Sequence, residues 1–97
     1  MPYAVKMAPG ALKDIDESFE WYNEQIPGLG NRFINCIDER ITELSITPNS
    51  GSVRYDNVRC ALVKIFPYTI HYSVDEKLKT LIVFRILHIS KKPLWEK

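Results

Sequence analysis

The chain lacks any long apolar run, since no stretch approaches the roughly 20 residues that a transmembrane helix needs. Its first residues, 1–6, lack the apolar block of a signal peptide. The two cysteines, Cys36 and Cys60, lie far apart in different kinds of segment, which favours buried reduced thiols over a disulfide. No metal-ligand spacing is present. We therefore expect a cytoplasmic protein with no membrane association, no metal and no cofactor.

The net charge of +1 hides an uneven distribution. Residues 1–48 carry 4 Lys and Arg against 8 Asp and Glu, a net charge of −4, whereas residues 49–97 carry 9 against 4, a net charge of +5. This asymmetry indicates a basic working face opposite an acidic one. Acidic helices beside strands edged with lysine for solubility would give the same counts, so both interpretations stay open.

The first half of the chain predicts a strand followed by two helices. Residues 3–7 alternate as in a short strand, and Pro9 suits the first turn of a helix. Acidic residues such as Asp14 and Glu17 are expected to face water. The apolar positions of the first helix recur at spacings of three and four and are Leu12, Ile15, Phe19, Tyr22 and Ile26.

The segment 27–30, Pro-Gly-Leu-Gly, must end the first helix, because proline disfavours helical geometry in the residue before it and glycine permits positive φ. A second helix over residues 31–45 then folds back antiparallel after this short connection. Its apolar face consists of Phe33, Ile34, Ile37, Ile41 and Leu44.

The second half is rich in β-branched and aromatic residues and predicts four strands. Strands 58–66 and 79–88 are nearly continuous in apolar residues, which indicates central positions. The expected fold is α+β, with an N-terminal strand and an antiparallel helix hairpin packed on one face of a mainly antiparallel, four- to five-stranded sheet. One domain fills residues 1–97. The predicted strands are 52–55, 58–66, 69–75 and 79–88, with turns at 56–57, 67–68 and 75–77.

The last third of the chain concentrates groups that handle phosphate. Metal-independent RNA cleavage needs an acid, a base and cations for the phosphoryl oxygens. His88 suits the acid or base, and Arg59 and Arg85 suit the cations, so these three are the candidate catalytic residues. Candidate substrate-binding residues, by charge or by stacking on bases, are Lys64, Tyr68, Lys91 and Lys92.

Strand alternation argues against a complete catalytic set on one surface. Arg59 and Lys64 are separated by an odd number of residues, and so are Arg85 and His88, so each pair points to opposite faces unless a bulge intervenes. Simpler roles also exist for each residue. Arg85 suits a salt bridge, His88 suits a hydrogen bond to the backbone, and His71 is expected on a solvated strand face.

Two tryptophans and a tyrosine are candidate partner-binding residues. Trp21 lies off the apolar stripe of the first helix, and an exposed Trp on a helix is typical of a contact surface. Tyr22 lies on the stripe beside it, and Trp95 follows the last strand. Core packing is the competing explanation for Trp21.

A series of motifs stands in order along nearly the whole chain: Pro27-Gly28-Leu29-Gly30, Arg32-Phe33, Ile37-Asp38, Pro48, Val58-Arg59, Phe66-Pro67-Tyr68, Ile70, Tyr72, Arg85-Ile86-Leu87-His88 and Trp95. In this order and spacing they resemble the RelE/ParE toxin superfamily of bacterial type II toxin–antitoxin systems, the plasmid-stabilisation type. Lys92 falls where an arginine is common in that superfamily.

The resemblance implies a growth-arresting toxin that a cognate antitoxin protein neutralises. The Pro-Gly-Leu-Gly turn, the Phe-Pro-Tyr strand and the helix lengths favour a ParE-like toxin, which implies DNA gyrase as the target and no enzymatic activity. One alternative is a RelE-like endoribonuclease that cuts mRNA on the ribosome. The other is an inactive, toxin-like protein-binding module.

Overall fold

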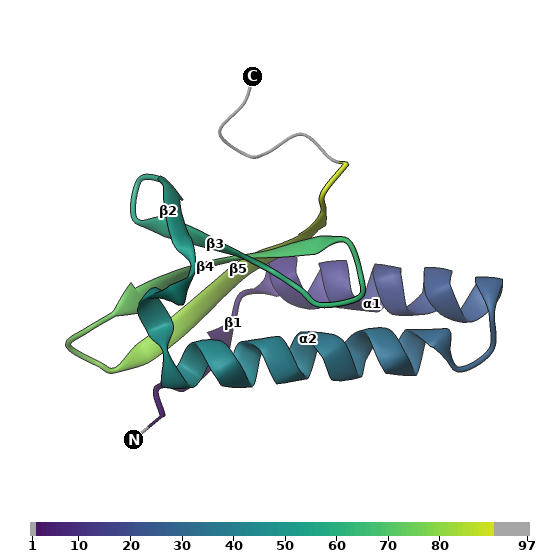
Figure 1. The fold of residues 1–97 in the computed structure, drawn as a ribbon, viewed down its shortest axis with the longest axis horizontal. Helices are drawn as coiled ribbons and strands as arrows, with labels where there is room; N and C mark the ends of the chain where they lie inside the picture. The colour runs from purple at the N-terminus through teal and green to yellow at the C-terminus, as the bar shows by residue number, and fades with distance from the viewer. Residues whose placement is uncertain (1, 91–97) are drawn as a thin grey trace.

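The computed structural model describes residues 2–90. The chain forms two layers, with both helices on one face of a five-stranded sheet (Figure 1). The predicted α+β architecture is therefore confirmed. The elements are β1 (Ala4–Met7), α1 (Pro9–Gln25), α2 (Leu29–Ile46), a 3₁₀ turn (Pro48–Ser50), β2 (Ser52–Tyr55), β3 (Val58–Leu62), β4 (Tyr68–Asp75) and β5 (Thr80–His88).

The sheet has the order β1-β5-β4-β3-β2, with β1 parallel to β5 and the remaining pairs antiparallel. A bulge at Phe84 interrupts the β4–β5 ladder, because His71 pairs with Arg85 whereas Tyr72 pairs with Val83. The predicted strand 58–66 ends early at Leu62, and the following loop returns the chain to Tyr68, the first residue of β4. Within residues 2–90, no helix is both long and apolar enough to span a membrane.

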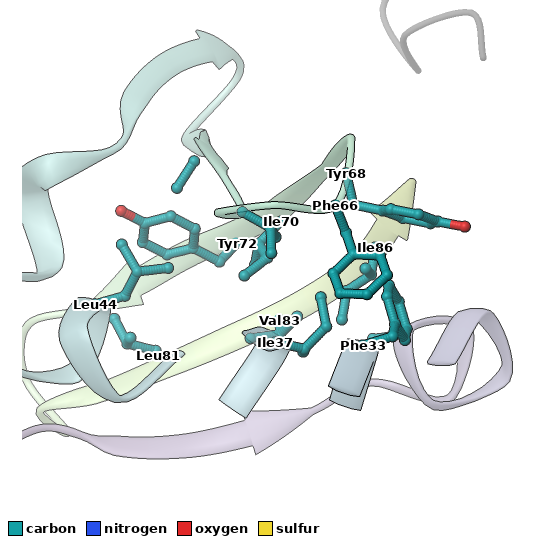
Figure 2. Close-up of a cluster of buried hydrophobic side chains, with 13 residues drawn as sticks. Phe33, Ile37, Leu44, Phe66, Tyr68, Ile70, Tyr72, Leu81, Val83 and Ile86 are labelled. Atoms are coloured by element: carbon teal, nitrogen blue, oxygen red, sulfur yellow. The ribbon is translucent and has the colours of Figure 1, made fainter. Parts of the chain in front are cut away.

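The core lies between α2 and the sheet (Figure 2). Phe33, Ile37 and Leu44 of α2 are buried, as the helical spacing predicts, whereas α1 buries only Ala11 and Asp14. Two expectations for the stripe of α1 are wrong: Leu12 is 50% exposed and Ile26 is 59% exposed. The turn that follows α1 extends beyond the sheet in Figure 1.

The helix hairpin is fixed by its glycines. Gly28 has a φ of 88°, which a side chain rarely adopts, and the Gly30 N–H donates to the Asn23 side-chain oxygen at 2.8 Å. A Cβ on Gly30 would lie 2.5 Å from the Phe19 carbonyl oxygen. The Pro-Gly-Leu-Gly segment therefore sets how closely α1 approaches α2, and with it the position of the outer face of α1.

Asp14 connects α1 to the edge of β5, which corrects the expectation that this carboxylate faces water. β1 pairs with β5 only as far as Val83, so the N–H of Ile86 has no strand partner on that side. The Asp14 carboxylate accepts this N–H at 2.9 Å and also pairs with Arg85. Asp14 of α1 thus supplies the hydrogen-bond acceptor that β1 does not provide at this edge of β5.

Candidate functional site

A groove of about 450 Å³ lies between the outer face of α1 and the ends of two neighbouring strands. Four of its residues are spaced along one face of the helix, at positions i, i+1, i+4 and i+5. Tyr68 and His88 face each other across β4 and β5 and provide the sheet side. The residues that line the groove are Glu17, Ser18, Trp21, Tyr22, Tyr68, His88 and Ser90.

Aromatic rings form much of the groove. Trp21 is 55% exposed and meets Tyr22 edge-on, with ring centroids 5.0 Å apart. Tyr22 in turn lies 6.2 Å from the ring of Tyr68. Beneath them, Phe33 contacts both tyrosines and Phe66 contacts Tyr22. Figure 2 shows the Tyr68 hydroxyl pointing away from this core. The groove is therefore supported from below by well-packed rings.

The Tyr22 phenol remains neutral in this environment. Burial, with a smaller contribution from the Tyr68 hydroxyl, raises the pKa of Tyr22 to about 12. A neutral phenol keeps its ring face available to apolar or cationic groups without adding a negative charge.

His88 is held in one tautomer. Its Nδ1 accepts the backbone N–H of Ser90 at 3.0 Å and lies 2.7 Å from the Ser90 hydroxyl. Because a backbone N–H only donates, Nδ1 carries no proton and the neutral ring has its proton on Nε2. The expected backbone hydrogen bond of His88 is thus present. In this state the ring offers a donor rather than a general base on Nε2.

Among residues 2–90, the charged side chains that share cavities with His88 are carboxylates. Glu17 lines the groove and also a smaller adjoining cavity of about 60 Å³, to which Asp14 contributes. Among residues 2–90, no Lys, Arg or His nitrogen lies within 4 Å of the Glu17 carboxylate. Within the described part of the chain, the charged group beside the imidazole in the groove is therefore a carboxylate, which disfavours an anionic phosphodiester there.

Arg85 points away from His88, as strand alternation predicts. Its guanidinium binds Asp14 through two hydrogen bonds of 2.8 and 3.0 Å. These hydrogen bonds raise the pKa of Arg85, and the charge of Glu17 adds to the effect. The salt-bridge role considered for Arg85 is thus present, and the Nε–Nη2 edge of its guanidinium already binds a carboxylate.

Arg59 lies in a different part of the sheet. It donates to the carbonyl oxygens of Gly51 and Asn49 at 2.6 and 3.2 Å and lines a separate cavity of about 230 Å³. Arg59 pairs with Tyr72 whereas His88 pairs with Tyr68, so strand spacing and rise put their backbones about 16 Å apart. The structure therefore does not bring the three candidate catalytic residues together.

Lys64 is exposed in the loop between β3 and β4. Its carbonyl accepts the Phe66 N–H at 2.8 Å, and the residue between them, Ile65, has a φ of 73°. This is a strained γ-turn with a β-branched residue at its centre, and Ile65 is 78% exposed. The other predicted residues Lys91, Lys92 and Trp95 lie outside the described residues.

His71 is buried, with 3% of its surface exposed, which corrects the expectation of a solvated side chain. Its Nδ1 lies 3.2 Å from the Tyr55 hydroxyl and 3.4 Å from the Cys60 sulfur, because β2 and β3 carry these groups to the same sheet face. Burial lowers the pKa of His71 and raises that of Cys60. Both shifts favour neutral forms, so the Cys60 thiol is not an activated nucleophile.

Stability should depend on pH through His71. Burial, reinforced by the charge of Arg85, lowers its pKa below the ordinary 6.5, while Asp14 opposes the shift. Below pH 6.5 the unfolded chain therefore takes up the proton more readily, and the free energy of unfolding should fall as the pH falls towards the lowered folded value. Urea unfolding at pH 7.5 and 5.5 measures this difference. In His71→Gln the difference should shrink, and an unchanged difference would contradict the assignment to His71.

Sequence reasoning missed Glu17 and Ser18 as groove residues, although their helical spacing to Trp21 and Tyr22 was a usable signal.

The sequence model of the family described as "ParE toxin of type II toxin-antitoxin system, parDE" matches residues 5–93. The chain belongs to the ParE toxin family. It is the toxin of a type II toxin–antitoxin system in the RelE/ParE superfamily, so the superfamily predicted from the sequence is confirmed.

Solved structures of toxin–antitoxin systems share the ParE fold of this chain. The chromosomal ParDE system of P. aeruginosa matches with a TM-score of 0.78 and 21% identity over 91% of this chain and 97% of that chain. The intact E. coli RelBE complex matches with a TM-score of 0.70 and 14% identity over 92% and 99%. The RelBE2 complex of Mycobacterium tuberculosis matches with a TM-score of 0.64 and 20% identity over 91% and 99%. A comparison with curated protein sequences found no match.

Proposed function

We propose that this protein arrests growth by binding a protein target, DNA gyrase, and that it does not cut RNA. A cognate antitoxin neutralises it by direct binding. The observation that carries the proposal is the environment of His88, whose charged neighbour in the groove, among residues 2–90, is the carboxylate of Glu17. An RNA-cleaving site needs the opposite charge, because negative charge develops on the phosphoryl oxygens during the reaction.

The positions of the arginines support the same conclusion. Arg85 is committed to Asp14, and Arg59 is committed to two carbonyl oxygens in another part of the sheet. Moving Arg85 to a phosphate would leave the buried Asp14 carboxylate without its partner, which is costly. The match to the ParE family over residues 5–93 favours the gyrase target over the ribosome.

The proposal predicts the outcome of a growth-arrest experiment. Induced expression should stop growth, primer extension should find intact messages, and double-strand DNA breaks should accumulate that depend on active gyrase. Co-expression of the antitoxin encoded beside the gene should restore growth. A chain with an early stop codon is the matched control, since its message is made but the toxin is not.

Messages with new 5′ ends in place of DNA breaks would reject the gyrase proposal. In that case His88→Ala should lower the number of cuts by about 10²- to 10⁴-fold, the usual contribution of a general acid or base. Harmless expression in cells without the antitoxin would instead indicate an inactive binding module.

A further inference from the structure

We propose that the groove beside α1 is a cage for a cation, and that it binds a lysine or arginine side chain of the antitoxin. The ammonium or guanidinium group lies between the rings of Trp21, Tyr22 and Tyr68 and pairs with the Glu17 carboxylate. This inference rests on the proposed function only in taking an antitoxin as the partner.

Three aromatic rings line the groove, with Trp21 the most exposed of them at 55% and Tyr68 largely buried at 8%. They come from two separate elements and are strongly inclined, at 84° between Trp21 and Tyr22 and 58° between Tyr22 and Tyr68. The negative face of an aromatic ring attracts a cation within about 6 Å of its centroid, and tryptophan does so best. Because Phe33 packs against both tyrosines and Phe66 packs against Tyr22 and Phe33, little ordering is needed on binding.

The charge of the groove selects a basic ligand over an acidic one. Glu17 lines the groove, and among residues 2–90 no cation lies within 4 Å of its carboxylate. The nearby charges of Asp14 and Arg85 offset each other in their ion pair. Helix α1 carries five carboxylates and one lysine, so its field adds to the attraction of a cation.

The size of the groove also fits this ligand. A volume of about 450 Å³ lies near the low end of binding pockets and accommodates one long side chain with a flanking apolar group. The exposed Trp21 gives that flanking group a contact surface. Aromatic and arginine anchors in such pockets commonly dominate the energy of protein complexes. The antitoxin is the partner whose tight, lasting binding a toxin requires, and so it is the occupant that we assign.

Glu17→Gln tests the cage with little risk to folding, because the Glu17 side chain is exposed. The substitution removes the charge and keeps the shape. The dissociation constant of the toxin–antitoxin complex should rise about tenfold to a hundredfold, as for the loss of one partner from an interfacial charge pair. The matched control is Asp16→Asn, an equal change of charge at an exposed position of the same helix outside the groove. It should change the constant less than about twofold.

Trp21→Leu should raise the dissociation constant of the toxin–antitoxin complex by about tenfold, because the tryptophan ring face is lost while Glu17 stays intact. The antitoxin side of the contact is located by changing each of its lysines and arginines singly to methionine. In one of these backgrounds Glu17→Gln should have no further effect, because the two residues act as a pair.

If Glu17→Gln and Asp16→Asn raise the dissociation constant equally, the proposed cage is wrong, because equal effects indicate only long-range electrostatic attraction. A Glu17→Gln effect that persists in every antitoxin background would also overturn the cage. The binding measurement involves neither gyrase nor RNA. Cut messages would therefore reject the proposed function without affecting this result, and a failed cage would leave the gyrase proposal untouched.

Discussion

Asp14→Ala should lower the free energy of unfolding of the toxin by about 3 kcal/mol, since it removes one partner of a largely buried ion pair and leaves the Ile86 N–H without its acceptor. The Asp14 side chain is only 9% exposed. Arg85 is 38% exposed, so water compensates part of its lost partner and the effect lies at the low end for a buried pair. Urea unfolding at pH 7 measures the change.

Two further variants show whether the contact itself is responsible. Asp16→Ala changes an exposed aspartate of the same helix and should alter stability by less than about 0.5 kcal/mol. Arg85→Met should reduce the cost of Asp14→Ala when the two are combined, because the charge that Asp14 neutralises is then absent. If Asp14→Ala and Asp16→Ala have equal effects, the role assigned to Asp14 is wrong.

Phe33→Ala should cost about 3–5 kcal/mol, the usual range for a fully buried phenylalanine. Phe33 contacts the rings of Tyr22, Phe66 and Tyr68, so its loss leaves a cavity directly beneath the groove. We expect weaker antitoxin binding as well, since the cage loses its support. Thermal or urea unfolding of the complex and of the toxin measures the two effects.

Phe33→Leu is the matched control for the cavity, because it retains most of the apolar volume. It should cost clearly less than Phe33→Ala, with affinity for the antitoxin largely preserved. An alanine variant as stable as the wild type would show that the ring cluster does not support this end of the molecule.

Local patterns were sufficient to predict the architecture. The spacing of Phe33, Ile37 and Leu44 predicted the buried face of α2, and the glycine-rich turn predicted an antiparallel hairpin. Strand composition placed β4 and β5 to within one residue at each end. These features depend on periodicity and turn chemistry, which act over a few residues and can be recognised in a single sequence.

Contacts between distant segments could not be predicted in the same way. Asp14 has the helical position of a solvated residue, and its burial follows from β1 ending at Met7 and exposing the edge of β5. His71 lies on a strand with polar alternation, and its burial follows from contacts with Cys60 of β3 and with Tyr55 of β2, two strands away. Both outcomes depend on strand order and register, which local patterns do not determine.

The candidate site was predicted in part. Trp21 was expected to be an exposed contact residue, and His88 and Tyr68 were selected as functional, and the structure brings all three to one groove. Two of the cations selected with them lie elsewhere, because Arg85 faces Asp14 and Arg59 is two strands away. The strand-alternation argument anticipated the separation of Arg85 from His88. The Glu17 carboxylate, which was not selected from the sequence, makes the groove better suited to binding a cation than to cleaving a phosphodiester.

The most direct test of the central claim combines purified toxin with purified gyrase and supercoiled plasmid DNA in one reaction, and with mRNA-programmed ribosomes in a parallel one. We predict that the toxin causes gyrase to leave double-strand breaks in the plasmid while the mRNA stays intact. Cleaved mRNA together with unaffected gyrase would contradict the account.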